Sequence, residues 1–118
     1  MKTPTFFILL SVLFIFTPAI QSENHSVASW YGGGEKLNKY TANGEVFNSN
    51  TLTCASWNHA FNEKLKVTNA INGKSVIVRV NDRGPAKRLG RTIDLTKAAF
   101  SKIANPGKGL AFVKIKKI

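Results

Sequence analysis

Two β-strand patterns joined by a tight turn constrain the fold of this chain more than any other feature. Apolar and polar residues alternate through Lys64–Asn69, as they do in a strand with one buried face. Asn72-Gly73 supplies the residue types that a two-residue hairpin turn requires. The return segment, Ser75–Val80, is rich in the β-branched residues that strands favour. We therefore expect a β-hairpin here, in a mainly β domain.

Shorter strand patterns lie on both sides of this hairpin. They cover Ser26–Tyr31, which ends at a glycine triplet, then Leu52–Ser56, and finally Leu110–Lys116. Thr96 is placed to cap a helix over Lys97–Ala104. The sequence therefore predicts a small, mostly β barrel with one short helix.

The N-terminal segment, residues 1–22, has the pattern of a secretory signal peptide. Lys2 precedes an apolar run at residues 6–16, and a helix-breaking proline and polar residues follow it. The run is shorter than the roughly 20 residues that span a bilayer. We expect cleavage after Ser22, which leaves one domain at 23–118, exported to the periplasm or the extracellular space without a transmembrane anchor. An uncleaved N-terminal anchor is the alternative interpretation.

The chain is strongly basic, with 17 Lys and Arg residues against 6 Asp and Glu residues and a net charge of +11. Such a charge attracts polyanions, which for an exported protein means cell-wall polymers, anionic lipid or extracellular nucleic acid. A surface that is basic only for solubility is the alternative. Neither the basic and aromatic pattern of a nucleic-acid-binding module nor a basic amphipathic helix is visible. We therefore expect no specific nucleic-acid partner.

Cys54 is the one cysteine of the chain, so an intramolecular disulfide is excluded. Its neighbours are small and apolar, which favours a buried, inert thiol over a nucleophile. His25 and His59 do not form metal-ligand spacing with it. We expect a monomer without metal or cofactor.

Two acidic residues stand in ordered surroundings and are the first candidates for an active site. Asp82 lies where an apolar strand breaks into an Arg-Gly-Pro turn at 83–85. Asp94 lies between Ile93 and Leu95, just before the expected helix. Two carboxylates that share a site raise each other's pKa, so that one of them can act as an acid near neutral pH. In the alternative interpretation Asp82 only accepts hydrogen bonds from its turn, and Asp94 caps the helix.

Several linked motifs, in this order and spacing, resemble the rare lipoprotein A family. They are Ala28–Gly32, Thr41–Phe47, Leu65–Asn69, Asn72–Val76, Val80–Pro85 and Ile93–Leu95, and together they span most of residues 23–118. The resemblance implies a six-stranded double-psi β-barrel, related to the expansins. It also implies an exported bacterial protein that acts on peptidoglycan glycan strands as an endolytic lytic transglycosylase, leaving anhydro-muramic ends.

The resemblance places both aspartates on neighbouring strand ends that line one groove. It implies Asp82 as the acid and base of the reaction and Asp94 as a second acid. Adjacent residues of a strand point to opposite sides, so at most one of Trp30 and Tyr31 faces the groove. The residues expected to contact substrate are Tyr31, Thr41, Ser56, Trp57 and Arg83.

One position departs from the family pattern. Ser56 stands where enzymatic members usually carry a histidine, and serine does not titrate as histidine does. His59, three residues further on, stands where the family commonly has an apolar residue. This departure favours an alternative function, a non-catalytic, expansin-like protein that binds cell-wall glycan. A second alternative is a secreted cationic protein that binds nucleic acid or membranes.

Overall fold

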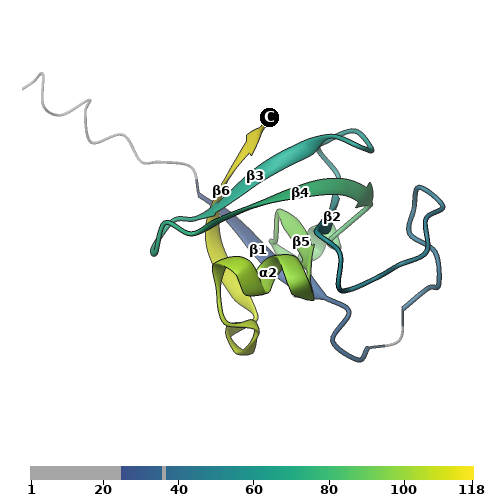
Figure 1. Cartoon of the computed structure of the whole chain (residues 1–118), viewed down its shortest axis with the longest axis horizontal. Coiled ribbons are helices and arrows are strands. Elements are labelled where there is room, and N and C mark those ends of the chain that lie inside the picture. Colours follow the sequence, from purple (N-terminus) through teal and green to yellow (C-terminus); the bar gives the residue numbers. More distant parts are fainter. Residues whose placement is uncertain (1–24, 36) are drawn as a thin grey trace, which may run out of the picture.

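The computed structural model describes residues 25–35 and 37–118, so the predicted signal peptide lies outside the described residues. Six strands form a closed barrel in the order β1-β5-β2-β4-β3-β6 (Figure 1). The strands are β1 (Ser26–Tyr31), β2 (Thr53–Ser56), β3 (Lys64–Asn69), β4 (Ser75–Asp82), β5 (Ile93–Thr96) and β6 (Leu110–Lys117). Helix α2 (Lys97–Ile103) and the short 3₁₀ turns η2 (Lys87–Leu89) and η3 (Pro106–Lys108) complete the described elements. The predicted mainly β barrel with one short helix is confirmed.

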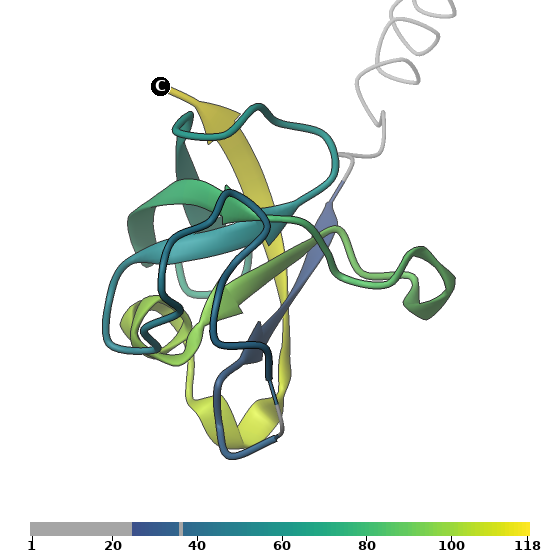
Figure 2. The ribbon, with the colours of Figure 1, turned by 90° about the vertical axis from the view of Figure 1, so that its right-hand side faces the viewer.

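The hairpin of β3 and β4 has the predicted antiparallel pairing, with Val67 opposite Val76. Strand β4 is longer than its sequence pattern indicates, because it continues to Asp82. The extension pairs in parallel with β2, where Ala55 is the partner of Asp82. A second parallel pair joins β1 to β5. An antiparallel pairing of β2 with β5, with Ala55 opposite Asp94, joins these two pairs, so Asp82 and Asp94 both lie beside Ala55. The β4–β5 loop projects from the side of the barrel (Figure 2).

The core lies inside the barrel and under α2. Alternate residues of the strands point inward, and Ala99, Phe100 and Ile103 of the helix pack against them. The buried strand residues include Ala28, Cys54, Leu65, Val67, Val78, Val80, Ile93, Leu95 and Val113. The inert Cys54 thiol is thus confirmed as buried, and burial raises its pKa to about 12.

Thr96 caps α2, as its sequence position predicts. Its Oγ1 accepts a hydrogen bond from the backbone N–H of Ala99, 3.3 Å away. The interpretation of Asp94 as the helix cap is therefore wrong, because the chain enters the helix two residues later. This leaves the Asp94 carboxyl on the outer side of β5, available to a site.

Phe100 is the largest fully buried side chain among the described residues. We expect Phe100→Ala to lower the free energy of unfolding by about 3–5 kcal/mol, because it removes apolar contacts and leaves a cavity between helix and barrel. Urea denaturation measures this change. Ile71→Ala, at an exposed position, serves as control and should stay within about 0.5 kcal/mol of the parent protein. Equal losses in the two variants would contradict this packing.

Candidate active site

A groove with a volume of about 490 Å³ lies on the outside of the barrel, where β1, β2, β4 and β5 meet the loop that follows β1. Both candidate acids line it, together with three of the five residues expected to contact substrate. The residues that line it include Tyr31, Thr41, Ala42, Ala55, Asp82, Arg83, Pro85 and Asp94.

Asp94 projects outward from the middle of β5. Its neighbours Ile93 and Leu95 point into the core, so the alternation of the strand directs Asp94 to the groove. Ser29 is its partner in the parallel β1–β5 pair, and Ser29 Oγ donates a hydrogen bond of 2.9 Å to Asp94 Oδ1. Burial raises the pKa of Asp94 above its ordinary value, although the Ser29 hydrogen bond and Arg91 oppose this shift. The nearby carboxylates of Glu35 and Asp82 add to the rise.

Asp82 ends β4 and is held by two separate backbone segments. Its Oδ1 accepts hydrogen bonds from the N–H groups of Ala42 and Arg83, each at 2.9 Å. The hydroxyl of Tyr31 lies 3.5 Å from Oδ2 and donates to it. Asp82 therefore does accept a hydrogen bond from its own turn, but two donors from other parts of the chain also fix its direction. Burial, followed by the charge of Asp82, raises the pKa of Tyr31, so this phenol remains a donor.

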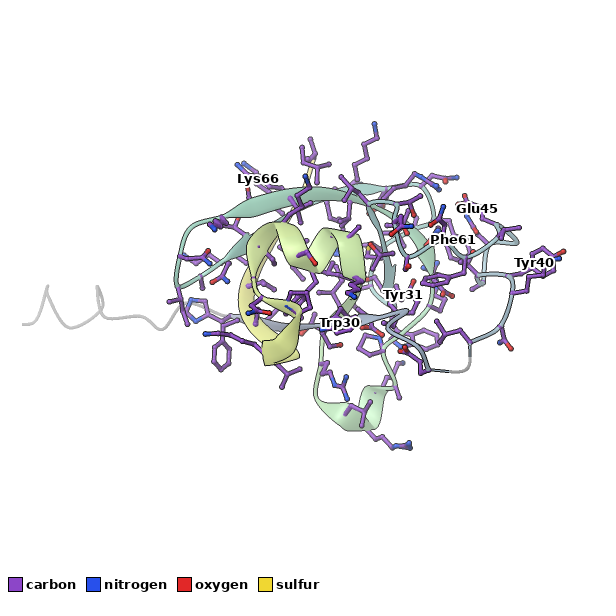
Figure 3. All side chains as sticks on the ribbon, turned by 60° about the horizontal axis from the view of Figure 1, so that its bottom comes forward. Trp30, Tyr31, Tyr40, Glu45, Phe61 and Lys66 are labelled. Carbon is purple, nitrogen blue, oxygen red and sulfur yellow. The ribbon has the colours of Figure 1, made fainter. Side chains whose placement is uncertain are left out.

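Strand β1 supplies one hydroxyl donor to each acid. Ser29 and Tyr31 are two residues apart, so they project to the same side of the strand. Trp30 projects to the other side, packs on the core and donates its indole N–H to Pro106 O at 2.8 Å. In Figure 3, Trp30 lies beside α2, whereas Tyr31 lies toward the loop that carries Tyr40. Tyr31 is thus the member of the Trp30–Tyr31 pair that faces the groove.

An ion pair outside the groove holds the loop that carries Thr41 and Ala42. Arg79 Nη1 and Nη2 donate to the two carboxylate oxygens of Glu45, at 2.7 and 2.8 Å. This bidentate contact lowers the pKa of Glu45 to about 2. Because the same loop supplies the Ala42 N–H to Asp82, the ion pair indirectly positions a candidate catalytic group. Glu45 has no local feature in the sequence that marks it, since Arg79 lies 34 positions away.

Arg83 lines the groove, but its guanidinium is directed at the protein itself. Nη1 donates to the carbonyl oxygens of Ser56 and His59, both at 3.0 Å. The guanidinium carbon lies 3.8 Å from the centre of the Phe61 ring. The charge of Arg83 thus holds the β2–β3 loop against the end of β4.

Two residues expected in the groove lie elsewhere. Ser56 is buried and is opposite Ile93, a core residue, so its side chain points inward, whereas Ala55 faces the groove. Trp57 follows the end of β2 and is half exposed. Its indole N–H donates to Pro85 O at 2.6 Å, which places the ring beside the groove wall. The β2 register decides both positions, and a four-residue strand shows too little periodicity to reveal it.

Residues 25–35 and 37–118 contain no group of three or more His, Cys, Asp or Glu side chains placed to hold a metal ion. In the same part of the chain, no helix has the length and apolar composition needed to cross a membrane.

Comparison with known proteins decides the family. Residues 23–115 match the family model described as lytic transglycolase. The chain belongs to this family. It is 51% identical over 90 residues to the endolytic peptidoglycan transglycosylase RlpA of Rickettsia bellii, a match that covers 75% of this chain and 39% of that protein. It is 45% identical over 100 residues to the Campylobacter jejuni protein of the same name, covering 85% of this chain and 36% of that one. The chain thus spans well under half the length of these relatives.

Solved structures support the fold. An expansin of Clavibacter michiganensis in complex with cellohexaose aligns with a TM-score of 0.62 at 19% identity, covering 80% of this chain and 49% of that one. The Streptomyces papain inhibitor aligns with a TM-score of 0.61 at 24% identity, covering 84% of this chain and 96% of that one. The protein is an RlpA-like double-psi β-barrel, and the resemblance to the rare lipoprotein A family is confirmed.

The raised pKa of Asp94 has a consequence for stability. The folded protein binds this proton more tightly than the unfolded chain does, so ionisation of Asp94 costs stability as pH rises above its unfolded pKa of about 3.9. We therefore expect Asp94→Asn to have a higher Tm than the parent protein at pH 7. The difference should disappear below about pH 3.9, where Asp94 is protonated in both states. Thermal unfolding followed by circular dichroism across this range measures it.

Glu45→Gln is the control with the opposite sign. The pKa of Glu45 is lowered by Arg79, so its ionised form stabilises the fold at neutral pH and the variant should have a lower Tm at pH 7. An Asp94→Asn variant that is also less stable at pH 7 would contradict the burial of this carboxylate.

Proposed function

We propose that the protein is an exported lytic transglycosylase that cleaves the glycan strands of peptidoglycan. The observation that carries this proposal is the presence of Asp82 and Asp94 in one groove, with the pKa of Asp94 raised by burial. The family match and the names of the curated relatives, which are endolytic peptidoglycan transglycosylases, support the class of reaction.

The reaction requires an acid and a base but no water. The bond between C1 of N-acetylmuramic acid and the bridging oxygen breaks, and that oxygen receives a proton. The 6-hydroxyl oxygen of the same muramic acid bonds to C1 and closes the anhydro ring, while its proton passes to a base. Two carboxyl groups, one protonated and one ionised, supply both proton transfers.

The surroundings of the two acids divide these roles. Asp94 is the half-buried group whose pKa is raised, so it suits protonation of the leaving oxygen. Asp82 is oriented by the N–H groups of Ala42 and Arg83, so this carboxyl group is positioned to take the proton of the 6-hydroxyl. Asp82 then loses its proton to solvent and Asp94 takes one from solvent, which restores both groups before the next cleavage. Tyr31 and Thr41 contact the sugar within the groove, and Trp57 contacts the glycan at its edge.

The rival proposal is an expansin-like protein that binds wall glycan without cutting it. Ser56 favours it, because serine stands at the position where enzymatic members usually carry a histidine, and serine does not titrate as histidine does. The two proposals share the ligand and differ only in whether a bond is broken.

Digestion of purified sacculi separates them. We expect the exported protein to release fragments with anhydro-muramic ends, detected by mass spectrometry, from intact sacculi or from sacculi stripped of stem peptides. Asp82→Asn and Asp94→Asn should each lower the release by about 10²–10⁴-fold, because each removes one proton transfer. Ser101→Ala, on the exposed face of α2, is the matched control and should keep the parent rate. Pelleting of the parent protein with sacculi without any release would establish the rival.

The role of Asp94 as the acid also predicts a pH dependence. Release should fall as pH rises through the pKa of Asp94, because the proton is lost. The positive charge of Arg91 lowers this pKa, so Arg91→Gln should move the alkaline limb of the pH–rate profile to higher pH. Arg88→Gln makes the same change of net charge on the exposed η2 turn and should leave the limb in place. Equal shifts in the two variants would indicate a general effect of charge rather than the titration of Asp94.

A further inference from the structure

The outer face of β3, β4 and β6 brings cationic side chains together in register. Lys66 lies directly opposite Lys116 across β3 and β6, and Lys64 lies opposite Arg79 across β3 and β4. Like charges directly opposite each other destabilise a sheet. We call Lys64, Lys66 and Lys116, all exposed, the lysine face.

Within the described part of the chain, two acidic side chains near this surface, Glu63 and Glu45, are already bound to other groups. Glu63, beside the lysine face, is bound to Lys117 at 3.3 Å and to His59 at 3.1 Å. Glu45 is bound to Arg79. Within residues 25–35 and 37–118, no ion pair joins an acidic side chain to Lys64, Lys66 or Lys116. Among the residues that the structure describes, these three lysines thus have no bound acidic side chain, and an external anion would stabilise this surface.

Apolar side chains are exposed on the same outer surface. Ile77 lies opposite Lys66 and is 51% exposed. Phe112 points outward from β6, on the same side of the strand as Lys116, and is 56% exposed. Ile71 extends this patch, because it lines a hollow of about 350 Å³ together with Phe112. Cations interleaved with exposed apolar side chains are typical of surfaces that bind at a lipid–water interface.

We propose that this surface docks on a membrane leaflet rich in acidic phospholipid. The lysines would meet headgroup phosphates, and Ile77 and Phe112 would enter the boundary between headgroups and acyl chains. A wall polysaccharide or a nucleic acid would neutralise the lysines equally well. A sugar face or a nucleobase stacks on an exposed ring such as Phe112. The boundary of a lipid leaflet would in addition bury the aliphatic Ile77, and this is why the observations favour lipid.

The position of the lysine face in the barrel determines how a docked protein would be oriented on the membrane. The β3–β6 pair lies across the closed barrel from the β2–β5 pair, which carries Ala55 and Asp94 of the groove. Figure 3 shows Lys66 on the side of the molecule away from Tyr31 and Tyr40. A protein docked through the lysine face would thus hold its groove open to an extended substrate outside the membrane. The docking itself does not depend on the proposed catalytic activity.

Co-sedimentation of the exported protein with vesicles tests the charge component. We expect binding to vesicles that contain phosphatidylglycerol, little binding to phosphatidylcholine alone, and weaker binding as salt screens the charges. Each lysine near an acidic surface contributes about a factor of five, so Lys64→Gln, Lys66→Gln and Lys116→Gln combined should weaken binding by about a hundredfold. Lys39→Gln, Lys97→Gln and Lys102→Gln combined, all at exposed positions, give the same net charge and should have a much smaller effect. Equal losses in the two triple variants would overturn the proposal.

The apolar component needs a test at constant charge. Ile77→Ser and Phe112→Ser combined should weaken vesicle binding by about tenfold, because their apolar area no longer leaves water. Circular dichroism confirms that this variant is folded. Unchanged vesicle binding in the serine variant would overturn lipid docking, and so would a parent protein that binds sacculi or duplex DNA but not acidic vesicles.

Discussion

The parallel pairing of β1 with β5 is the interaction on which both the barrel and its groove depend. β1 pairs with β6 on its other edge, so this pairing closes the ring of strands and leaves neither edge of β1 open. The same register sets Ser29 opposite Asp94 and therefore fixes the hydrogen bond between them. A shift of one residue would turn Ser29 and Tyr31 toward the core and remove both hydroxyl donors from the acids.

The groove places two carboxyl groups where at least one of them, Asp94, is partly shielded from water, which disfavours its ionised form. A half-buried Asp94 is less favourable when ionised, and the raised pKa expresses that cost. The barrel tolerates it because the buried apolar core inside the strands and under α2 supplies the stability. Asp82 is held in another way, by donors from its own turn and from the Thr41–Glu45 loop, which the Glu45–Arg79 ion pair anchors. Burial thus has the largest effect on the pKa of Asp94, whereas hydrogen bonds from separate segments fix the orientation of Asp82.

The family relationship and the local chemistry bear on different questions. The match over residues 23–115 identifies the barrel and its ancestry, and related folds include a protein solved with an oligosaccharide and a protease inhibitor. Fold alone therefore does not fix function. The two carboxyl groups in the groove favour catalysis, whereas the buried Ser56 favours binding alone. The lysine face adds a second surface whose charge is independent of that question.

The sequence by itself determined the features that depend on residues close together in the chain. The β3–β4 hairpin, the Thr96 cap and the burial of Cys54 all follow from alternation, turn chemistry and local composition, and motif spacing pointed to Asp82 and Asp94 as the acids. Only the tertiary structure decided which side chains share a surface. Strand register turned Ser56 inward, placed Trp57 beside the groove, joined Glu45 to Arg79 and set Lys66 opposite Lys116. The physical reason is that these contacts link strands and loops far apart in the chain, whose register is fixed by closure of the barrel.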